Sequence, residues 1–337
     1  MSLEKLNQNE LKLGEEIIDL AHVLTAKGLV VRTWGNFSRR VDSQSILITP
    51  SGKAYDTMCP DDLVKIDLSG ENAEIVSPGK PSSEMPMHAL SYKLYPDVNV
   101  IIHTHQVFAS AISLYGRSFP LTAEYAAGFA SDNLELSPYN LPGTSMLHKN
   151  MRTTMEESGA KVILMERHGA FILASNIEEA IARAELLEKF SREKFAELTG
   201  KEPDRRSDIH LNFADEEPAD HYKDAQGREE VCVYSRDPLI QDFLKSGLST
   251  YLDDFAQICG PKIKNRRKNN SAVLDPVQGL ARCYGRDEAD ACNVRAVLEK
   301  NARAAHVAGI SRQKPIAGWE ARLMRFIYRT KYSKVAE

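Results

Sequence analysis

The stretch VNVIIHTHQVFASAI, residues 98–112, sets a buried strand directly against two histidines. Residues 100–102 are a continuous apolar run, which is typical of a strand that enters a core. Because side chains alternate across a strand, His103 and His105 share one face while Thr104 takes the other. Two imidazoles about 7 Å apart along a strand can bind one divalent cation. The spacing alone also fits two histidines that are merely hydrogen-bonded at a strand end.

A third histidine has the same setting. His168 follows the apolar run VILME and precedes Gly169, so it too is expected at the end of a strand. Three histidine ligands leave one position of a tetrahedral zinc ion open for water or substrate, which is the arrangement of a catalytic site. The third residue therefore favours the interpretation of the pair as part of a metal site.

The stretch KPSSE, residues 80–84, precedes a predicted helix over residues 82–98. Ser82 and Ser83 either cap this helix or, with its exposed N–H groups, form a cradle for an anion. Glu84 would favour the helix dipole as an acidic residue of the first turn. His88 stands four residues after Glu84, and we expect it to pack in the helix rather than to serve as a rival metal ligand.

Two glycine-containing turns add polar groups to this inventory. RTWGNFSRR holds Gly35 and Asn36, and ITPSGKAYD holds Ser51 and Gly52 after an expected strand. By composition each is a turn. The Asn36 side chain is in addition a candidate donor to a phosphate group.

The composition excludes several classes of protein. The chain has 337 residues, 42% of them hydrophobic and 27% charged, which is neither a disordered nor a fibrous composition. A net charge of -4 does not indicate the excess of positive charge that is typical of proteins that bind nucleic acid. No apolar run approaches the roughly 20 residues that span a bilayer. The N-terminus lacks the basic start and apolar middle of a signal peptide. The five cysteines form no CxxC, which favours reduced thiols. We therefore expect a cytoplasmic protein with no nucleic-acid or membrane partner.

Helical patterns over residues 8–27, 82–98, 106–116, 144–158 and 176–198 alternate with strand patterns and predict a layered α/β domain over residues 1–200. Residues 201–228 are highly charged and read as a linker or a surface excursion. Residues 229–337 contain an internal similarity, in which Gly279 matches Gly169 and Gln278 stands where the first segment has His168. This predicts a degenerate second copy of the first domain, with an unrelated helical cap as the alternative.

The motifs GNFS, ITPSG, KPSSE, HTH and RHG, in this order over residues 10–200, together resemble the class II aldolase/adducin family. The resemblance implies a three-layer α/β/α fold around a mostly antiparallel central sheet. It implies Zn²⁺, with Mn²⁺ and Co²⁺ as alternatives, held at His103, His105 and His168. It also implies a homo-oligomer.

The remaining site residues follow from the same resemblance. Glu84 matches the family's catalytic carboxylate. Tyr125, in TAEYAAGF, resembles a tyrosine that acts across a subunit boundary. The positions that match the family's substrate-phosphate site are Gly35, Asn36, Ser51, Gly52, Ser82 and Ser83.

The function that the resemblance implies is that of a zinc-dependent aldehyde-lyase of carbohydrate metabolism. It would cleave a ketose 1-phosphate to dihydroxyacetone phosphate and an aldehyde through a zinc-stabilised enediolate. A sugar-phosphate 4-epimerase, a non-catalytic adducin-like scaffold, and a decarboxylase or dehydratase stay open as alternatives. The residues do not select the sugar.

Overall fold

The computed structural model describes residues 4–30, 34–201, 219–223, 227, 229–267 and 270–332. These residues divide into two compact units. Unit 1 consists of the residues up to 109 together with 116–190. Unit 2 consists of residues 110–115 and of those from 191 onwards. The division falls within a long helix that precedes the expected domain boundary at residue 200.

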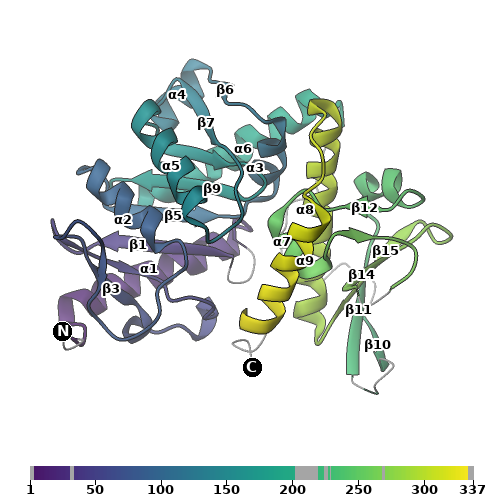
Figure 1. Ribbon diagram of the computed structural model, residues 1–337, viewed down its shortest axis with the longest axis horizontal. Helices are drawn as coiled ribbons and strands as arrows, with labels where there is room; N and C mark the ends of the chain where they lie inside the picture. The colour runs from purple at the N-terminus through teal and green to yellow at the C-terminus, as the bar shows by residue number, and fades with distance from the viewer. Residues whose placement is uncertain are drawn as a thin grey trace. The chain divides into compact units, whose positions relative to one another are not determined.

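Unit 1 is built on a nine-stranded sheet with the strand order β4-β3-β2-β1-β5-β9-β8-β7-β6 (Figure 1). Its strands are β1 Gly35–Arg40, β2 Ser45–Ile48, β3 Val64–Asp67, β4 Glu74–Ile75, β5 Val100–Thr104, β6 Phe119–Pro120, β7 Asn133–Ser137, β8 Val162–Met165 and β9 Gly169–Ala174. All neighbouring strands of this sheet pair antiparallel except β7 and β8, which run parallel. The mostly antiparallel central sheet is thus confirmed.

Helices accompany this sheet at the positions that the apolar periodicity indicates. They are α1 Gln8–Ala26, α2 Met85–Leu94, α3 Val107–Ile112, α4 Ala123–Phe129, α5 Ser145–Ser158 and α6 Ile177–Thr199. The helix expected over 8–27 is α1, which begins with a capping box between Asn7 and Glu10 and is followed by Gly28 at φ 69°. The α4 helix has no counterpart among the expected elements.

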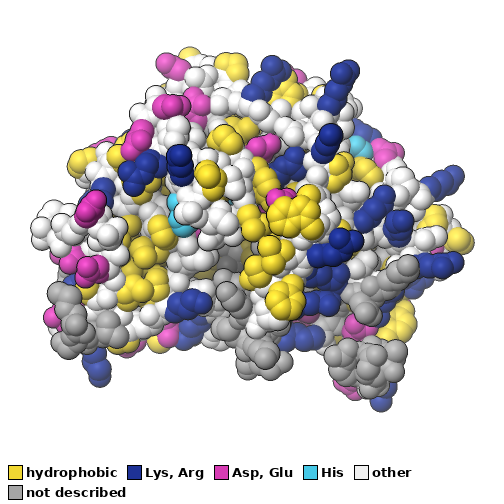
Figure 2. Space-filling view, in the orientation of Figure 1, with side chains coloured by type: hydrophobic (Ala, Val, Ile, Leu, Met, Phe, Trp, Pro, Cys, Tyr) yellow, Lys and Arg dark blue, Asp and Glu magenta, His cyan; other side chains and the backbone are white. Residues whose placement is uncertain are grey.

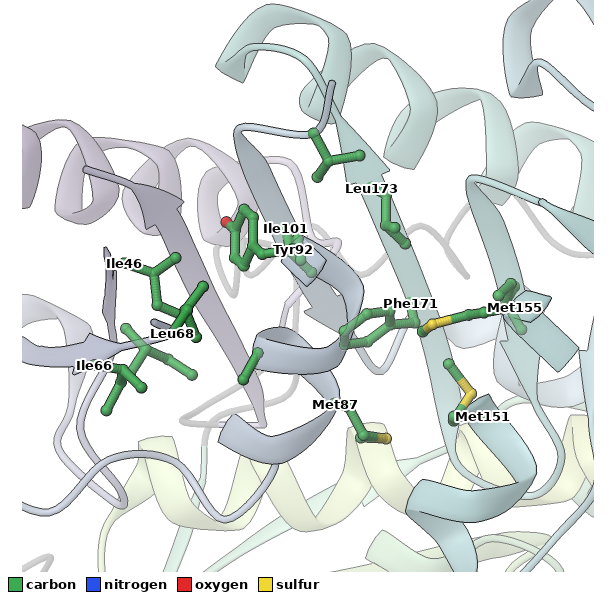
Figure 3. Close-up of a cluster of buried hydrophobic side chains, with 14 of the residues drawn as sticks. Ile46, Ile66, Leu68, Met87, Tyr92, Ile101, Met151, Met155, Phe171 and Leu173 are labelled. Atoms are coloured by element: carbon green, nitrogen blue, oxygen red, sulfur yellow. The ribbon is translucent and has the colours of Figure 1, made fainter. Parts of the chain in front are cut away.

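One face of the sheet is covered by α2 and α5. Figure 3 shows the apolar cluster between these layers, where Ile101 and Phe171 of the central strands meet Met87 of α2 and Met151 and Met155 of α5. Burying each such side chain contributes about 1.5–3 kcal/mol. This cluster therefore fixes how closely α2 approaches the strands that carry the histidines.

The opposite face is covered by α1 and α6. Thr104 points away from the histidines, and its hydroxyl donates to Gln106, whose amide in turn donates to the Ala184 carbonyl of α6 (2.7 Å). The α1 helix packs on β1 and β2. Together with α2 and α5 on the other side, these helices complete the expected α/β/α layering.

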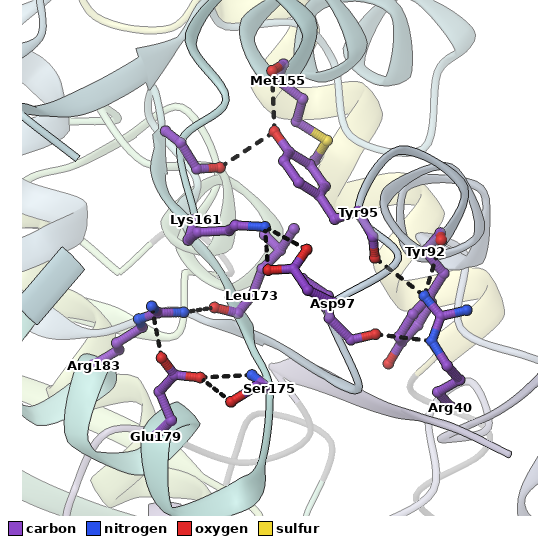
Figure 4. A network of polar contacts seen from close by, with 12 residues as sticks. Arg40, Tyr92, Tyr95, Asp97, Met155, Lys161, Leu173, Ser175, Glu179 and Arg183 are labelled. Carbon is purple, nitrogen blue, oxygen red and sulfur yellow. Dashed lines mark hydrogen bonds and ion pairs between the residues drawn. The ribbon is translucent and has the colours of Figure 1, made fainter. Parts of the chain in front are cut away.

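A polar network fixes the end of α2. Figure 4 shows the Arg40 guanidinium of β1 donating to the carbonyl oxygens of Tyr92 (2.9 Å) and Tyr95 (3.2 Å). The Tyr95 hydroxyl donates to the Met155 carbonyl of α5 at 3.0 Å. The α2 helix is therefore tied at its C-terminal end to both β1 and α5, which leaves its N-terminal end, with Glu84, at a defined place over the sheet.

Unit 2 holds a four-stranded sheet of order β10-β11-β15-β14 and a two-stranded one. Its elements are β10 Asp220–Lys223, β11 Glu229–Ser235, β12 Leu248–Ser249, β13 Lys262–Ile263, β14 Ala272–Asp275, β15 Leu280–Gly285, α7 Asp253–Cys259, α8 Glu288–Ser311 and α9 Gly318–Ile327, followed by the π-helical turn Tyr328–Tyr332. Most of the predicted linker lies outside the described residues, but β10 falls in it and pairs with β11. On α9, Trp319 and Phe326 are exposed, and Figure 2 shows hydrophobic side chains over this helix.

The two units share an order of elements. The hairpin β8–β9 is followed by α6, and the hairpin β14–β15 is followed by α8. Met165 pairs with Gly169 in the first hairpin and Asp275 with Leu280 in the second, so the second turn is one residue longer. In both units the second hairpin strand also pairs antiparallel with an earlier strand, β9 with β5 and β15 with β11.

No helix in the described part of the chain is long and apolar enough to cross a membrane. The five cysteines are unbridged, and all but Cys59 are buried.

Candidate metal centre

The structure brings the three predicted histidine ligands together. The Nε2 atoms of His103 and His105 lie 2.9 Å apart, and the rings of His103 and His168 stack with centroids 4.8 Å apart. One ring nitrogen of each histidine lies within 4.8 Å of the others, and all three residues are buried. Buried nitrogen lone pairs at this separation repel one another unless a proton or a cation lies between them. The group therefore fits a divalent metal ion.

The tautomer of His103 supports this assignment. Its Nδ1 lies 2.9 Å from the Ala170 carbonyl oxygen, which can only accept, so Nδ1 carries the proton. The lone pair is then on Nε2, the atom that faces His105. A backbone carbonyl on the other ring nitrogen is the usual partner of a metal-binding histidine, because it fixes both tautomer and ring orientation.

Close approach of two strands places His168 against His103. Gly169 begins β9 next to Ala170, the partner of Thr104 on β5, and a Cβ at this position would collide with the Thr104 carbonyl oxygen and lie 3.2 Å from Cε1 of His103. The preceding residue of the turn, Arg167, adopts a left-handed conformation with φ 63°, which is unfavourable for a residue with a Cβ. Gly169 and this turn together let His168 stack on the His103 ring.

Glu84 lies beside the histidines. Its Oε1 is 2.9 Å from Nε2 of His168 and its Oε2 is 3.3 Å from Nε2 of His103. Oε2 also accepts a hydrogen bond from Nδ2 of Asn36 at 2.8 Å. Glu84 is the N-cap residue of α2, yet its side chain makes no cap hydrogen bond. The carboxylate is thus directed at the histidines and not at its own helix.

The environment sets the charge of these groups. Burial by itself would raise the pKa of Glu84, but the adjacent His103 and His168, with hydrogen bonds from His168 and Asn36, hold that pKa well below its usual range. Burial lowers the pKa of His103 well below its usual range. The site therefore combines an ionised carboxylate with a neutral imidazole, the protonation states that a cation requires of its ligands.

The three segments assigned to the phosphate are tied to one another. Pro50 and Pro81 form an isolated antiparallel bridge, flanked by hydrogen bonds from Ser51 N to Lys80 O (3.0 Å) and from Ser82 N to Thr49 O (3.1 Å). Thr49 N in turn donates to the Phe37 carbonyl of β1 at 3.0 Å, next to Asn36. The ITPSG and KPSSE turns therefore lie side by side at the start of β1.

Individual residues of this region differ in exposure. Asn36 and Ser82 are buried, Gly35, Ser51 and Gly52 are partly exposed, and Ser83 is exposed. The Ser82 N–H donates to the Thr49 carbonyl oxygen, a turn follows at Ser83 and Glu84, and α2 begins only at Met85. The prediction that Ser82 or Ser83 caps this helix is wrong, since the N-cap residue is Glu84. The Ser82 hydroxyl does accept from Glu84 N, at 3.3 Å.

Tyr125 lies on α4. Its ring packs against Phe190 of α6 with centroids 4.9 Å apart and against Phe129 at 6.2 Å, and the residue is buried. These contacts place the side chain in an aromatic cluster. The role across a subunit boundary that the resemblance implies for Tyr125 stays a prediction.

His88 is not a metal ligand. Its Nε2 lies 2.5 Å from Oδ1 of Asn36 and its Nδ1 lies 2.6 Å from the Ser38 hydroxyl, so both ring nitrogens are engaged. In the sequence, the only indication of a role for His88 is its position four residues after Glu84. That spacing places the two residues on one face of a helix, but it does not predict these hydrogen-bond partners. The contact with Asn36 links His88 to the candidate site through one intervening residue.

The chain belongs to the family described as Class II Aldolase and Adducin N-terminal domain, whose pattern matches residues 15–194. A 5-methylthioribulose-1-phosphate/5-deoxyribulose-1-phosphate aldolase of Escherichia coli O45:K1 is 35% identical over 172 residues, which are 51% of this chain and 78% of the relative. L-fuculose phosphate aldolase of Escherichia coli K12 is 33% identical over 171 residues, 50% of this chain and 76% of that one. A probable L-ribulose-5-phosphate 4-epimerase of Mycoplasma pneumoniae is 33% identical over 198 residues, 55% and 80% of the two chains.

Solved structures show the same fold. An L-fuculose 1-phosphate aldolase superposes with a TM-score of 0.52 at 25% identity, covering 62% of this chain and 98% of the other. The protein YgbL of Escherichia coli superposes with a TM-score of 0.50 at 26% identity, covering 55% and 89%. The resemblance drawn from the five motifs is confirmed at the level of family and fold.

Proposed function

We propose that this protein is a metal-dependent aldolase that cleaves a ketose 1-phosphate to dihydroxyacetone phosphate and an aldehyde. The observation that carries the proposal is the convergence of three buried histidine nitrogens beside the carboxylate of Glu84. Aldolases of phosphorylated sugars among the relatives support the same chemistry.

His103, His105 and His168 would hold the metal. Three nitrogen ligands in a buried setting suit Zn²⁺, with Mn²⁺ and Co²⁺ as alternatives. A bound divalent ion would supply Lewis-acid stabilisation of negative charge on the substrate oxygens.

Glu84 is the proposed acid–base residue. Its carboxylate is ionised and nearly enclosed, so it can accept a proton from a substrate hydroxyl or carbon and return it later in the cycle. The hydrogen bond from Asn36 holds one carboxylate oxygen in a fixed direction. A base held in this way needs little reorganisation when the proton moves.

The paired turns at the start of β1 are the proposed phosphate site. They contribute Gly35, Asn36, Ser51, Gly52, Ser82 and Ser83. The backbone N–H groups and hydroxyls of such turns suit an anion. Binding energy at the phosphate would orient the distant reacting carbons.

A 4-epimerase is the second candidate, because one relative carries that name. Both reactions break the same type of C–C bond, but an epimerase re-forms it before release. The test incubates the metal-loaded protein with fuculose-, rhamnulose- and ribulose-type phosphates. Released dihydroxyacetone phosphate with free aldehyde supports the aldolase, and an epimer without aldehyde supports the epimerase. No turnover of any of them, at one metal ion per chain, would favour a scaffold.

Two further predictions extend this proposal to the assembly. We propose that the protein forms a homo-oligomer in which Tyr125 serves a neighbouring subunit. We also propose that unit 2 is a degenerate copy of unit 1, supported by the common order of β8, β9 and α6 with β14, β15 and α8. Where His103 lies opposite Phe171, unit 2 has Tyr234 opposite Arg282, so the copy has no equivalent ligand.

A further inference from the structure

We propose that His88 is a positioning residue that orients the Asn36 side-chain amide and, through it, the carboxylate of Glu84. The inference deepens the proposed function, since it rests on the acid–base role of Glu84. It assigns a task to a buried histidine whose described side-chain hydrogen bonds go to Asn36 and Ser38 and not to the three metal ligands.

The direction of each hydrogen bond follows from the orientation of the Asn36 amide. Its Nδ2 can only donate, and this atom lies 2.8 Å from Oε2 of Glu84. The Asn36 carbonyl oxygen Oδ1 therefore faces His88. Because Oδ1 can only accept, Nε2 of His88, 2.5 Å away, must carry the proton.

The same reasoning continues past the imidazole ring. A neutral His88 with its proton on Nε2 has a lone pair on Nδ1, and the Ser38 hydroxyl 2.6 Å away donates to it. The Ser38 oxygen can then accept from the Tyr92 hydroxyl at 3.0 Å. The chain of donors therefore runs from Ser38 through His88 and Asn36 to Glu84, whereas the Tyr92 hydroxyl has a second acceptor in the Asn99 carbonyl oxygen at 3.4 Å.

Packing holds the imidazole in this place. His88 is fully buried in α2, and its ring stands edge-on to Phe171 of β9 with centroids 5.0 Å apart. Figure 3 shows Phe171 and Tyr92 within the apolar layer between α2 and the sheet. Burial disfavours a charged imidazole and lowers the pKa of His88 to about 3, which keeps the ring neutral. A neutral, immobile ring is what a fixed tautomer requires.

An asparagine amide has two orientations that differ by a half-turn and are nearly equal in shape. With His88 in place, only the orientation that directs Nδ2 to Glu84 satisfies both neighbours. Without it, the opposite orientation would set the Asn36 oxygen against the carboxylate. The expected consequence is a displaced base, and a displacement of about 1 Å can reduce turnover about 100-fold.

The experiment compares His88→Leu with His88→Gln. Leucine fills the space but cannot donate, whereas the glutamine amide nitrogen can replace the Nε2 donor. Ser38→Ala is a milder third variant, because it removes only the partner that fixes the tautomer. Ser91→Ala is the control, since Ser91 is also buried on α2 but its hydroxyl donates to the Met87 carbonyl, outside the chain of donors.

Three measurements are made on the full chain: kcat and KM with the sugar phosphate that turns over, the melting temperature, and the ¹⁵N shifts of His88 and of the Asn36 amide. We expect kcat to fall by about 100-fold in His88→Leu and to recover largely in His88→Gln, with KM nearly unchanged. The kcat of Ser38→Ala should lie between those of His88→Leu and the wild type, and Ser91→Ala should lower only the melting temperature. His88 should show a protonated Nε2 and an unprotonated Nδ1.

The inference is overturned if His88→Leu keeps the kcat of the wild type. It is also overturned if kcat falls as far in His88→Gln as in His88→Leu while the two variants have the same melting temperature. If His88→Leu does not fold, the kcat of Ser38→Ala decides in its place. A wild-type protein without turnover on any sugar phosphate would contradict the proposed function instead. In that case the ¹⁵N shifts decide. A proton on Nδ1 of His88 would refute the inference. A proton on Nε2, together with an Asn36 amide that is restrained in the wild type and no longer restrained in His88→Leu, would uphold it.

Discussion

The imidazole rings of His103 and His168 stack 4.8 Å apart with their planes inclined by 13°, although one ends β5 and the other belongs to the turn before β9. The Nε2 atom of each ring lies next to Glu84, which places one carboxylate oxygen 2.9 Å from His168 and the other 3.3 Å from His103. The candidate site therefore depends on the pairing of β5 with β9 and on the placement of α2, and each can be tested.

Replacing a ligand should abolish metal binding. We expect about one divalent ion per wild-type chain and a loss of most of it in His103→Ala, because two imidazoles bind a cation much more weakly than three. His221→Ala is the matched control, since His221 lies exposed on β10 of unit 2. Atomic emission on dialysed protein gives the metal content. Equal content in His103→Ala and wild type would contradict the assignment.

Removing the metal should lower stability. A ligand that binds only the folded state stabilises it by RT ln(1 + [L]/Kd), which is about 4 kcal/mol at a thousand times Kd. We therefore expect the chelated protein to melt at a lower temperature and to recover when Zn²⁺ is restored. Calorimetry measures both, and His103→Ala should show no response to either treatment.

Glu84→Gln should remove the base while keeping the shape of the site. We expect kcat to fall by about 10² to 10⁴, the usual contribution of a positioned acid–base group. KM and metal content should change little, because the amide keeps the size of the carboxylate. Steady-state kinetics with the sugar phosphate provides the measurement. Unchanged turnover on every substrate tried would support a scaffold rather than an enzyme.

Gly169→Ala should destabilise unit 1. The new methyl group would collide with the Thr104 carbonyl oxygen, and relieving the clash requires β9 to shift from β5. We expect a loss of about 1–3 kcal/mol, the range for overpacked sites, and weaker metal binding. Gly309→Ala is the control, because nothing lies within 4 Å of its added Cβ in α8 and alanine favours a helix. The midpoint of urea unfolding should therefore fall in Gly169→Ala and rise in Gly309→Ala.

The protonation of His88 should make stability depend on pH. Burial lowers its pKa to about 3 against the opposing charge of Glu84, whereas the ordinary value is 6.5. Between these values the unfolded chain binds a proton that the folded chain does not, so stability falls as the pH is lowered through this window. From pH 7 to pH 5 the loss is about 2 kcal/mol. Urea unfolding of wild type and His88→Gln at both pH values isolates this contribution. An equal change in the free energy of unfolding between pH 7 and pH 5 in the two proteins would contradict it.

Local patterns predicted much of unit 1. The period of apolar residues located α1, α5 and α6, because each helix buries one face. The alternation of side chains placed His103 and His105 on one face of β5, and the structure confirms their proximity. The predicted start of α2 at residue 82 is wrong, because the hydrogen bond from Ser82 to Thr49 is a contact between distant segments. Such a contact leaves no trace in local composition.

The sequence by itself determined which residues carry the chemistry: three histidines at strand ends, an acidic residue after two serines, and an ordered set of turns that marks the family. Only the tertiary structure decided that Glu84 faces the histidines instead of capping its helix, and that His88 bonds Asn36 and Ser38 instead of a metal. The physical reason is that residue type and spacing act within one strand or helix. The direction of a buried side chain is set by the layer packed against it, here α2 over the sheet, held by the apolar cluster and by Arg40.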